Sequence, residues 1–318
     1  MRIGLDIMGG DFAPEETTLG AIAAQKELPA DVRLVLIGDE AKAKQIIAGA
    51  GADASVFDFV PSTEDIEMHE HPTKAFQQKP NSSISIGFHL LKGGKLDAFC
   101  SAGNTGAMLV GSMFSVKSIP GIMRPAISTL VPKETGGYGL LLDVGVNADC
   151  KPENLQQFAI LGSLYAEHVM HIKNPKVGLI SIGEEDEKGN ALTLAANQLL
   201  KATKGINFIG NVEGRDLFND MADVIVSDGF TGNIMLKLAE TFYTLLQKRH
   251  IKHEYFDKFN YEGYGGTPIL GVNSTVMIAH GISNHLAICS MLLLTREVVE
   301  AQLSQKIAAA LALVPAIA

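Results

Sequence analysis

Two turns of nearly the same sequence carry the residues of this chain that are best suited to bind an anion. Residues 101–106 read Ser-Ala-Gly-Asn-Thr-Gly, and residues 227–232 read Ser-Asp-Gly-Phe-Thr-Gly. Each turn follows a short apolar strand and opens an apolar, helix-like run. A small-residue turn between a strand and a helix leaves backbone N–H groups unpaired at the positive end of a helix dipole. Two such turns predict a phosphate-containing substrate held between related halves.

Further polar residues follow other predicted strands and could serve the same chemistry. The turn at residues 8–15 is rich in glycine, but it is neither a dinucleotide fingerprint nor a Walker A loop, so nucleotide binding has little support. Residues 143–147 begin with aspartate and end with asparagine, which often form a turn or a helix cap. Lys188 closes an acidic loop and can reach a cleft. His280 could position or protonate a reacting oxygen, because its ordinary pKa lies near neutrality; a histidine bonded to backbone is the alternative.

Three other features have plainer interpretations. The run 64–71 is rich in histidine and glutamate, but no His pair at i,i+4 supports metal ligation, so we expect a solvated loop. Cys100 lies in a strand and is expected to be a buried small hydrophobe rather than a nucleophile. The basic residues at 247–253 could complement a helix C-terminus or form a docking patch, and the sequence favours neither.

The amino-acid composition and net charge argue against several classes of protein. The chain has 318 residues, of which 47% are hydrophobic, enough for a sizeable core. Its net charge of −9 argues against non-specific nucleic-acid binding, which depends on neutralising phosphates. Three cysteines without framework spacing suit a reducing compartment. No signal peptide or apolar run of the ~18 residues that span a membrane is visible, so we expect a cytoplasmic protein.

Short apolar strands alternate with helical stretches along nearly the whole chain, which predicts an α/β fold with a doubly wound, largely parallel sheet and helices on both faces. Ligands on such sheets lie beyond the carboxyl ends of the strands, where both turns occur. We expect one domain over 1–318, with lobes of 1–120 plus 267–318 and of 121–266. The predicted strands cover residues 2–7, 33–38, 55–60, 96–101, 126–131, 139–144, 176–182, 206–210, 223–227 and 274–280.

The motifs together resemble a known family. They occur in the order Met8–Asp11, Ser101–Ala107, Leu142–Asn147, Asn211–Gly214, Ser227–Asn233, Tyr264–Gly266 and His280–Gly281. This series is similar to the bacterial phosphate acyltransferases of phospholipid synthesis, the PlsX type, from about residue 1 to about residue 300. Each motif alone is weak, whereas the combination is highly specific.

The resemblance implies an enzyme that moves a fatty acyl chain from acyl carrier protein onto orthophosphate and releases acyl phosphate. It implies a fold like those of phosphotransacetylases and of isocitrate and isopropylmalate dehydrogenases. It also implies a homodimer without a metal or an organic cofactor. The acyl phosphate would go to a membrane glycerol-phosphate acyltransferase, so peripheral association with the membrane is expected.

The chain departs from the family in the segment that follows the second turn. Members often carry a longer apolar insertion there, whereas only about thirty residues separate Asn233 from Tyr264. Membrane contact through that insertion is therefore in doubt. The apolar C-terminal segment 307–318 could replace it, or could pack on the body of the protein or on a partner subunit.

The reaction needs little acid or base strength, because a thiol of pKa ~8.5 is a tolerable leaving group. Positioning and charge stabilisation are then the main contributions. The expected catalytic residues are His280, Lys188, Lys237 and Asn233. Of these, His280 and Lys237 would act on the carbonyl oxygen or sulfur, Lys188 would balance the charge of phosphate, and Asn233 would face the phosphate. The expected substrate-binding residues are Gly10, Asp11, Lys79, Ser101, Asn104, Thr105, Gly106, Arg124, Asp143, Asn147, Asp228, Thr231 and Gly232.

The two turns differ at two positions, since Asn104 stands where the second has Phe230, and Asp228 stands where the first has Ala102. We expect the first turn to cradle phosphate and the second to shape the acyl side. The alternatives are a phosphotransacetylase acting on short acyl-CoA, a hydroxyacid dehydrogenase on the same fold, and a non-enzymatic regulator that binds lipid or carrier protein.

Overall fold

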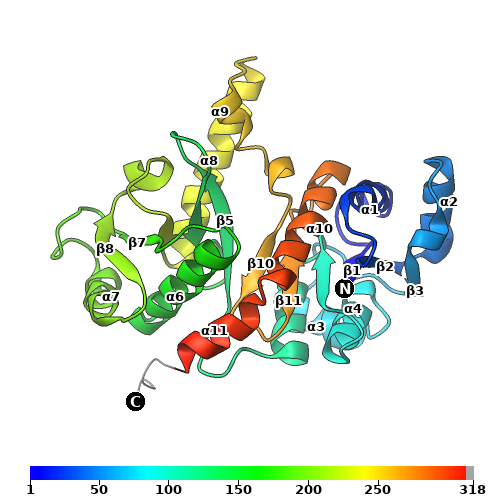
Figure 1. Ribbon diagram of the computed structural model, residues 1–318, viewed down its shortest axis with the longest axis horizontal. Coiled ribbons are helices and arrows are strands. Elements are labelled where there is room, and N and C mark those ends of the chain that lie inside the picture. Colours follow the sequence, from blue (N-terminus) through cyan, green and yellow to red (C-terminus); the bar gives the residue numbers. More distant parts are fainter. Residues whose placement is uncertain (313–318) are drawn as a thin grey trace. The chain divides into compact units, whose positions relative to one another are not determined.

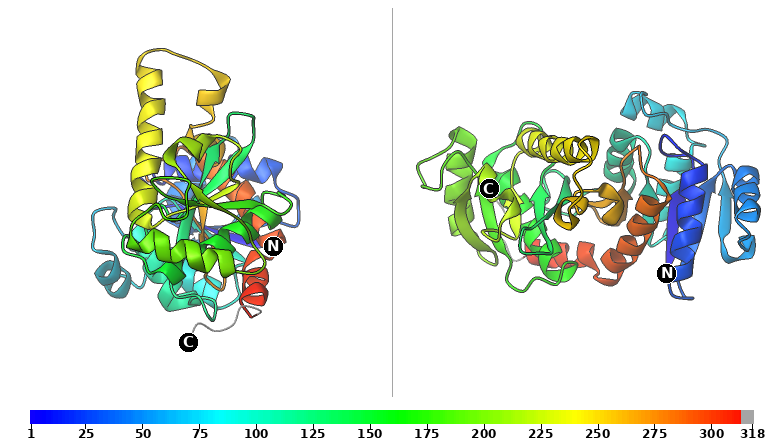
Figure 2. Two further views of the ribbon diagram at one scale, coloured as in Figure 1. Left: turned by 90° about the vertical axis from the view of Figure 1, so that its left-hand side faces the viewer. Right: turned by 90° about the horizontal axis from the view of Figure 1, so that it is seen from above.

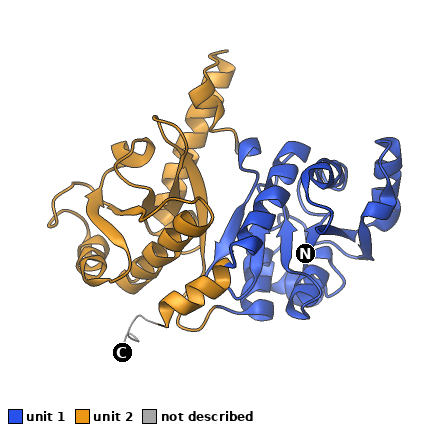
Figure 3. Cartoon of the chain, in the orientation of Figure 1, with its two compact units in different colours: residues 1–118, 261–302 blue, residues 119–260, 303–318 orange. Residues whose placement is uncertain are grey.

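The chain divides into two compact units in a computed structural model that describes residues 1–312 (Figure 1, Figure 3). Unit 1 contains Met1–Ser118 and Tyr261–Gln302, and unit 2 contains Ile119–Asn260 with the described residues from Leu303 onward. The boundaries expected from sequence were near residues 120 and 266. The segment from Leu303 onward groups with unit 2 because helix α11 (Leu303–Leu311) contacts helix α6 (Pro152–His168).

Unit 1 is built on a sheet whose strands run in the order β3-β2-β1-β4-β11-β10. Neighbouring strands are parallel except β10 and β11, which pair antiparallel. The strands are β1 (Arg2–Asp6), β2 (Arg33–Gly38), β3 (Asp58–Pro61), β4 (Ala98–Ser101), β10 (Thr267–Leu270) and β11 (Thr275–Ile278). The helices are α1 (Glu15–Glu27), α2 (Glu40–Gly49), α3 (Pro72–Gln78), α4 (Ser83–Lys92), α5 (Thr105–Gly111) and α10 (His285–Glu300).

Helices cover both faces of this sheet because successive strand residues point to opposite sides. On one face, α4 lies against β4, and a Cβ added to its Gly87 would overlap the ring of Phe99. On the other face, the buried thiol of Cys100 contacts the hydroxyl of Thr295 on α10. Helix α1 packs on α10, where Gly20 lies close to Ile288. The small residues let the helices approach closely enough to exclude water from the core.

Unit 2 repeats the plan with the strand order β5-β6-β9-β7-β8, in which only the pair β5–β6 is antiparallel. Helix α6 packs on β9 and β6, and α7 packs on α6. Helix α8 is long, and its C-terminal half projects beyond the rest of unit 2 (Figure 2). The elements not yet bounded are β5 (Ala126–Pro132), β6 (Tyr138–Leu142), β7 (Lys176–Ile180), β8 (Asn207–Val212), β9 (Val224–Val226), α7 (Ala191–Ala202), α8 (Gly229–Lys248) and α9 (Glu254–Asp257).

The predicted fold class is confirmed, and each predicted strand range overlaps an observed strand. Strand β10 was not predicted from sequence, because Pro268 interrupts a short run that pairs antiparallel. In the apolar C-terminal segment, Ile307 is buried on α11, and residues 313–318 lie outside the described residues. Within residues 1–312, no helix combines the length and the hydropathy needed to cross a membrane.

Candidate active site

Three loops of unit 1 meet at the carboxyl ends of the neighbouring strands β1, β4 and β11. They are residues 8–14 after β1, residues 102–104 after β4 and residues 279–284 after β11. The backbone N–H of Asp11 donates to the carbonyl oxygen of Gly281 at 2.7 Å, which ties the first loop to the third. The topology thus brings the N-terminal turn, the first Ser-x-Gly-x-Thr-Gly turn and His280 to one edge of the sheet.

The buried carboxylate of Asp6 holds the turn after β4 in place. Its Oδ2 accepts from the hydroxyl of Ser101 at 2.7 Å, and its Oδ1 accepts from the N–H of Met8 at 2.9 Å. Ser101 Oγ in turn accepts from the N–H of Gly103 at 2.9 Å. Burial raises the pKa of Asp6, while hydrogen bonds from Ser83 and Ser101 act in the opposite direction. One carboxylate therefore positions the backbone of two loops.

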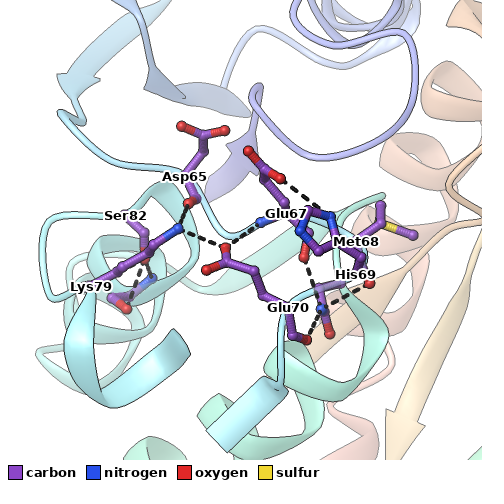
Figure 4. Close-up of polar contacts among 9 residues, drawn as sticks. Asp65, Glu67, Met68, His69, Glu70, Lys79 and Ser82 are labelled. Carbon is purple, nitrogen blue, oxygen red and sulfur yellow. Dashed lines mark hydrogen bonds and ion pairs between the residues drawn. The ribbon is translucent and has the colours of Figure 1, made fainter. Parts of the chain in front are cut away.

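Asn104 fixes this turn from the other side, by binding the loop whose residues Glu67, Met68 and Glu70 are labelled in Figure 4. Its Oδ1 accepts from the N–H of Ala107 at 3.0 Å and so caps α5. Its Nδ2 donates to the carbonyl oxygens of Glu67, Met68 and Glu70 at 3.0, 3.3 and 3.1 Å. Because both amide hydrogens are already used, the geometry favours a structural role over the direct phosphate contact expected for this side chain.

Lys79 is also engaged within unit 1. Its Nζ lies 2.6 Å from Glu70 Oε2 and donates to the carbonyl oxygen of Asp65 at 2.8 Å (Figure 4). The hydrogen bond with Glu70 raises the pKa of Lys79 and lowers that of Glu70. The run 64–71 is largely exposed, as predicted for a solvated loop, but it is anchored by Lys79, by Asn104 and by the buried side chain of Ile66.

The first turn keeps backbone donors available. Among residues 1–312, the N–H groups of Asn104, Thr105 and Gly106 form no hydrogen bond, whereas those of Ala107 and Met108 are both bonded to Asn104. These three donors follow a buried strand at an edge where small residues leave the backbone accessible. They can bind an anionic oxygen without any change in the surrounding fold.

In unit 2, Asp143 has a similar bracing role at the carboxyl ends of β6 and β9. Its carboxylate accepts from the N–H of Ile127 at 3.1 Å, and from the N–H and Nδ2 of Asn147 at 2.6 and 2.9 Å. Its carbonyl oxygen accepts from the hydroxyl of Ser227 at 3.2 Å. Burial raises the pKa of Asp143, and these hydrogen bonds oppose that shift. Asp143 and Asn147 therefore position the second turn.

The second turn nevertheless differs from the first in where its helix begins. Helix α8 starts at Gly229, the third residue of the motif, whereas α5 starts at Thr105, the fifth. Asp228 caps α8 by accepting from the N–H and hydroxyl of Thr231, at 2.9 and 2.8 Å. The N–H groups of Gly229 and Gly232 are also hydrogen-bonded. The second turn therefore offers fewer backbone donors to an anion than the first.

Comparisons with known proteins identify the family. A family model described as "Fatty acid synthesis protein" matches residues 1–306. A phosphate acyltransferase of Dictyoglomus thermophilum is 45% identical over 96% of both chains, and one of Halothermothrix orenii is 44% identical over 94% of this chain and 95% of its own. The chain belongs to the phosphate acyltransferase family.

Solved structures similar to this member of the family bear on its fold alone. A phosphotransacetylase from Streptococcus pyogenes is 15% identical, covers 94% of both chains and has a TM-score of 0.68. A 4-hydroxythreonine-4-phosphate dehydrogenase from Klebsiella pneumoniae is 13% identical over 93% of this chain and 97% of its own, with a TM-score of 0.56. The predicted relation to phosphotransacetylase and dehydrogenase folds is therefore confirmed.

The residues that the sequence singled out for phosphate acyltransferase chemistry fall into two groups. Unit 1 brings one group to its carboxyl edge, and unit 2 brings most of the other to its own. The first group is Gly10, Asp11, Lys79, Ser101, Asn104, Thr105, Gly106 and His280; the second is Arg124, Asp143, Asn147, Lys188, Asp228, Thr231, Gly232, Asn233 and Lys237. The prediction that both turns serve one substrate stays a prediction.

Within the second group, the three cations and Asn233 lie in different surroundings. Arg124 is exposed two residues before β5 and donates to the carbonyl oxygen of Asp149 at 3.0 Å. Lys188 is exposed in the loop after β7. Lys237 lies farther along α8 and pairs with Glu240 at 2.8 Å. Asn233 Nδ2 donates to the carbonyl oxygen of Val144 at 3.1 Å, which favours a structural role for it.

The structure adds detail on the partners of Asn104, on the Cys100 thiol and on metal binding. The carbonyl groups of Glu67, Met68 and Glu70 accept from Asn104, a contact that no local pattern signals because more than thirty residues separate the partners. Burial raises the pKa of Cys100 to about 12, so this thiol is not an available nucleophile. Within residues 1–312, no group of three or more His, Cys, Asp or Glu is arranged to hold a metal ion.

Proposed function

We propose that this chain transfers a fatty acyl group from acyl carrier protein to orthophosphate. The observation that carries the proposal is its similarity, at 45% identity over 96% of the chain, to a relative named phosphate acyltransferase. The backbone donors of Asn104, Thr105 and Gly106 support an anion site in unit 1 that suits orthophosphate. The shared name supports the acyl and phosphate substrates, and the carrier-protein donor is our inference.

In the proposed reaction, a phosphate oxygen attacks the carbonyl carbon of the thioester. A C–O bond forms, the C–S bond breaks, and the thiolate leaves and takes up a proton from solvent. Neither step needs a strong base, because phosphate is largely ionised at neutral pH and a thiol leaves readily. The turn at residues 101–106 would hold the phosphate with backbone donors. His280, at the same edge of unit 1, is the side chain that we propose for the carbonyl oxygen or sulfur.

The test of this proposal is trapping of the product. Purified protein is incubated with hexadecanoyl carrier protein and phosphate, and acyl phosphate is converted to hydroxamate with hydroxylamine. We expect hydroxamate only when phosphate is present. A parallel reaction with acetyl-CoA distinguishes a phosphotransacetylase, which would prefer that donor. Tight binding of the carrier protein without phosphate-dependent product would contradict the proposal and indicate a regulator.

We also propose that the protein is a homodimer formed through helix α8. Along one side of this helix, large apolar residues recur every three or four positions and are at least half exposed: Phe230, Ile234, Leu238, Phe242 and Leu245. A stripe of this kind on a projecting helix (Figure 2) is typical of a surface covered by a partner. Because the stripe itself carries no charge, it suits an isologous contact with a second copy.

Replacing Phe242 by glutamate is expected to convert the dimer into a monomer. Two glutamates would lie in the apolar contact, and burying an unpaired carboxylate is strongly unfavourable. Sedimentation velocity measures the outcome. The matched control is Thr244→Glu, which changes an exposed residue on a different side of the same helix and should leave the dimer intact. A Phe242→Glu variant that still sediments as a dimer would exclude this interface.

Peripheral membrane association, and delivery of acyl phosphate to a membrane glycerol-phosphate acyltransferase, remain proposals. The support in the chain is the exposed basic segment at the C-terminal end of α8, which contains Lys248, Arg249, Lys252 and the exposed apolar side chain of Ile251. Such a segment is attracted to anionic surfaces, including acidic carrier protein and anionic lipid. We propose that no metal or organic cofactor takes part.

A further inference from the structure

Three large apolar side chains stand exposed at the mouth of the candidate site in unit 1. Phe12, Met68 and Ile282 are 53, 47 and 52% exposed, respectively. They come from three different loops, which follow β1, β3 and β11. None of these side chains belongs to the buried core of the unit. Exposed apolar groups gathered at a polar site usually mark contact with a ligand.

Contacts on either side of each residue place these side chains around the same turn. Phe12 and Ile282 directly follow Asp11 and Gly281, which are joined by the 2.7 Å backbone hydrogen bond. A Cβ added to Gly281 would lie 2.8 Å from Met68 Cε, so Met68 reaches the third loop. The carbonyl oxygen of Met68 accepts from Asn104 Nδ2, which belongs to the first Ser-x-Gly-x-Thr-Gly turn.

The loops that carry these residues are fixed rather than loosely attached. The carbonyl oxygen of Phe12 accepts from the N–H of Glu16 in α1 at 3.1 Å. Ile282 lies two residues before Asn284, which caps α10 by accepting from the N–H of Ala287. The side chain of Met68 points away from the Lys79–Glu70 ion pair that anchors its loop (Figure 4). The apolar groups are therefore held in position before any ligand binds.

We propose that Phe12, Met68 and Ile282 form an apolar rim that receives the fatty acyl chain of the substrate. This inference rests on the proposed function, because it assigns a place to the chain whose carbonyl group would meet phosphate at the turn. The rim lies beside the backbone donors of residues 104–106, so a thioester carbonyl can approach the turn while its hydrocarbon chain lies on the rim. Phosphate needs no apolar contact, and a short acetyl group would not reach across three side chains.

If the acyl chain lies on the rim, contacts with these three side chains determine the preference of the protein for acyl chains of a given length. Each methylene removed from water onto an apolar surface favours binding roughly fourfold. Wild-type protein should therefore bind a hexadecanoyl carrier more tightly than an octanoyl carrier. Removing rim side chains should reduce this difference and leave the affinity for phosphate unchanged, because the phosphate donors belong to the backbone.

The experiment uses the double variant Phe12→Ser/Ile282→Ser and two donors, octanoyl and hexadecanoyl carrier protein. We expect the ratio of kcat/KM for the long over the short chain to fall about tenfold, with the KM for phosphate within about twofold of wild type. The matched control is Phe114→Ser. Phe114 is 63% exposed in the same unit but lies in the helical segment that follows α5. Its chain-length ratio should equal that of wild type.

Calorimetric binding of both carriers, in the absence of phosphate, separates this inference from the proposed reaction. If wild type binds the two carriers equally, or if the double variant keeps the wild-type preference, the proposal that the rim receives the acyl chain is wrong. This holds whatever the rate of acyl phosphate formation. If binding depends on chain length as expected but no phosphate-dependent acyl phosphate forms, only the proposed reaction fails. Chain-length-dependent binding that disappears in the double variant and persists in Phe114→Ser supports the rim.

Discussion

Replacing Asp6 by alanine is expected to lower the free energy of unfolding by about 3 kcal/mol and to weaken the turn after β4. The carboxylate accepts from the Ser101 hydroxyl and from the N–H of Met8, and it is 1% exposed. A hydrogen bond to a charged group contributes ~1.5–3 kcal/mol, and a buried donor left without a partner adds a further penalty. Because Ser101 and Gly103 lose their support together, we also expect the KM for phosphate to rise at least about tenfold.

Chemical denaturation and phosphate kinetics measure the two effects. The matched control is Asp53→Ala, since Asp53 accepts from the N–H and hydroxyl of Ser55 at 2.8 and 2.6 Å but lies at the surface. Its removal should lower the free energy of unfolding much less than the removal of Asp6, as expected for an exposed cap, without a change in phosphate KM. If Asp6→Ala and Asp53→Ala behaved alike in both measurements, Asp6 would not be the residue that positions the turn.

Much of the fold follows from local sequence because buried parallel strands are short, continuous apolar runs. Residues 33–38 and 126–131 are examples, and both are strands in the structure. The loops after such strands are also recognisable, since small residues let the backbone turn sharply into a helix. This is why the sequence alone predicts a candidate site at the carboxyl ends of the strands.

The roles of individual side chains were less predictable because they depend on partners that are distant in the sequence. Asn104 was expected to bind phosphate, yet its amide donates to the carbonyl groups of Glu67, Met68 and Glu70. Lys79 looked like a counter-charge for phosphate, yet it pairs with Glu70. In both cases the residue type indicated polar chemistry correctly, and only the packing of the loop decided what each side chain binds.

The doubled motif shows a second limit of sequence pattern. Its two copies share serine, glycine and threonine at the same positions, but α5 begins two motif positions later than α8. The cause is the capping residue, which is Asn104 in the first copy and Asp228 in the second. A change of cap moves the start of the helix and thereby decides which N–H groups remain available. The difference between the copies is therefore a difference in backbone hydrogen bonding, and it supports the first as the anion site.

Replacing Gly232 by alanine is expected to reduce turnover at least about 100-fold and to lower the free energy of unfolding by about 3 kcal/mol. A Cβ at this position would overlap the backbone carbonyl oxygen of Asp143 and would lie 2.6 Å from Ser227 Oγ. The carbonyl oxygen belongs to the backbone and cannot rotate away, so either α8 or the segment after β6 must shift. A displacement of about 1 Å at a positioning element can cost about 100-fold in rate.

The matched control is Gly139→Ala in β6 of the same unit. A Cβ there would meet its nearest neighbour, Lys133 Cε, at 3.4 Å, which is an ordinary contact, and the strand should accept it. Thermal denaturation and hydroxamate formation are measured for both variants. Normal turnover in Gly232→Ala would mean that the second turn can move without affecting the reaction, and the expectation that this turn takes part in substrate binding would be wrong. Loss of turnover in Gly232→Ala alone would attribute the effect to the contact between Asp143 and the start of α8.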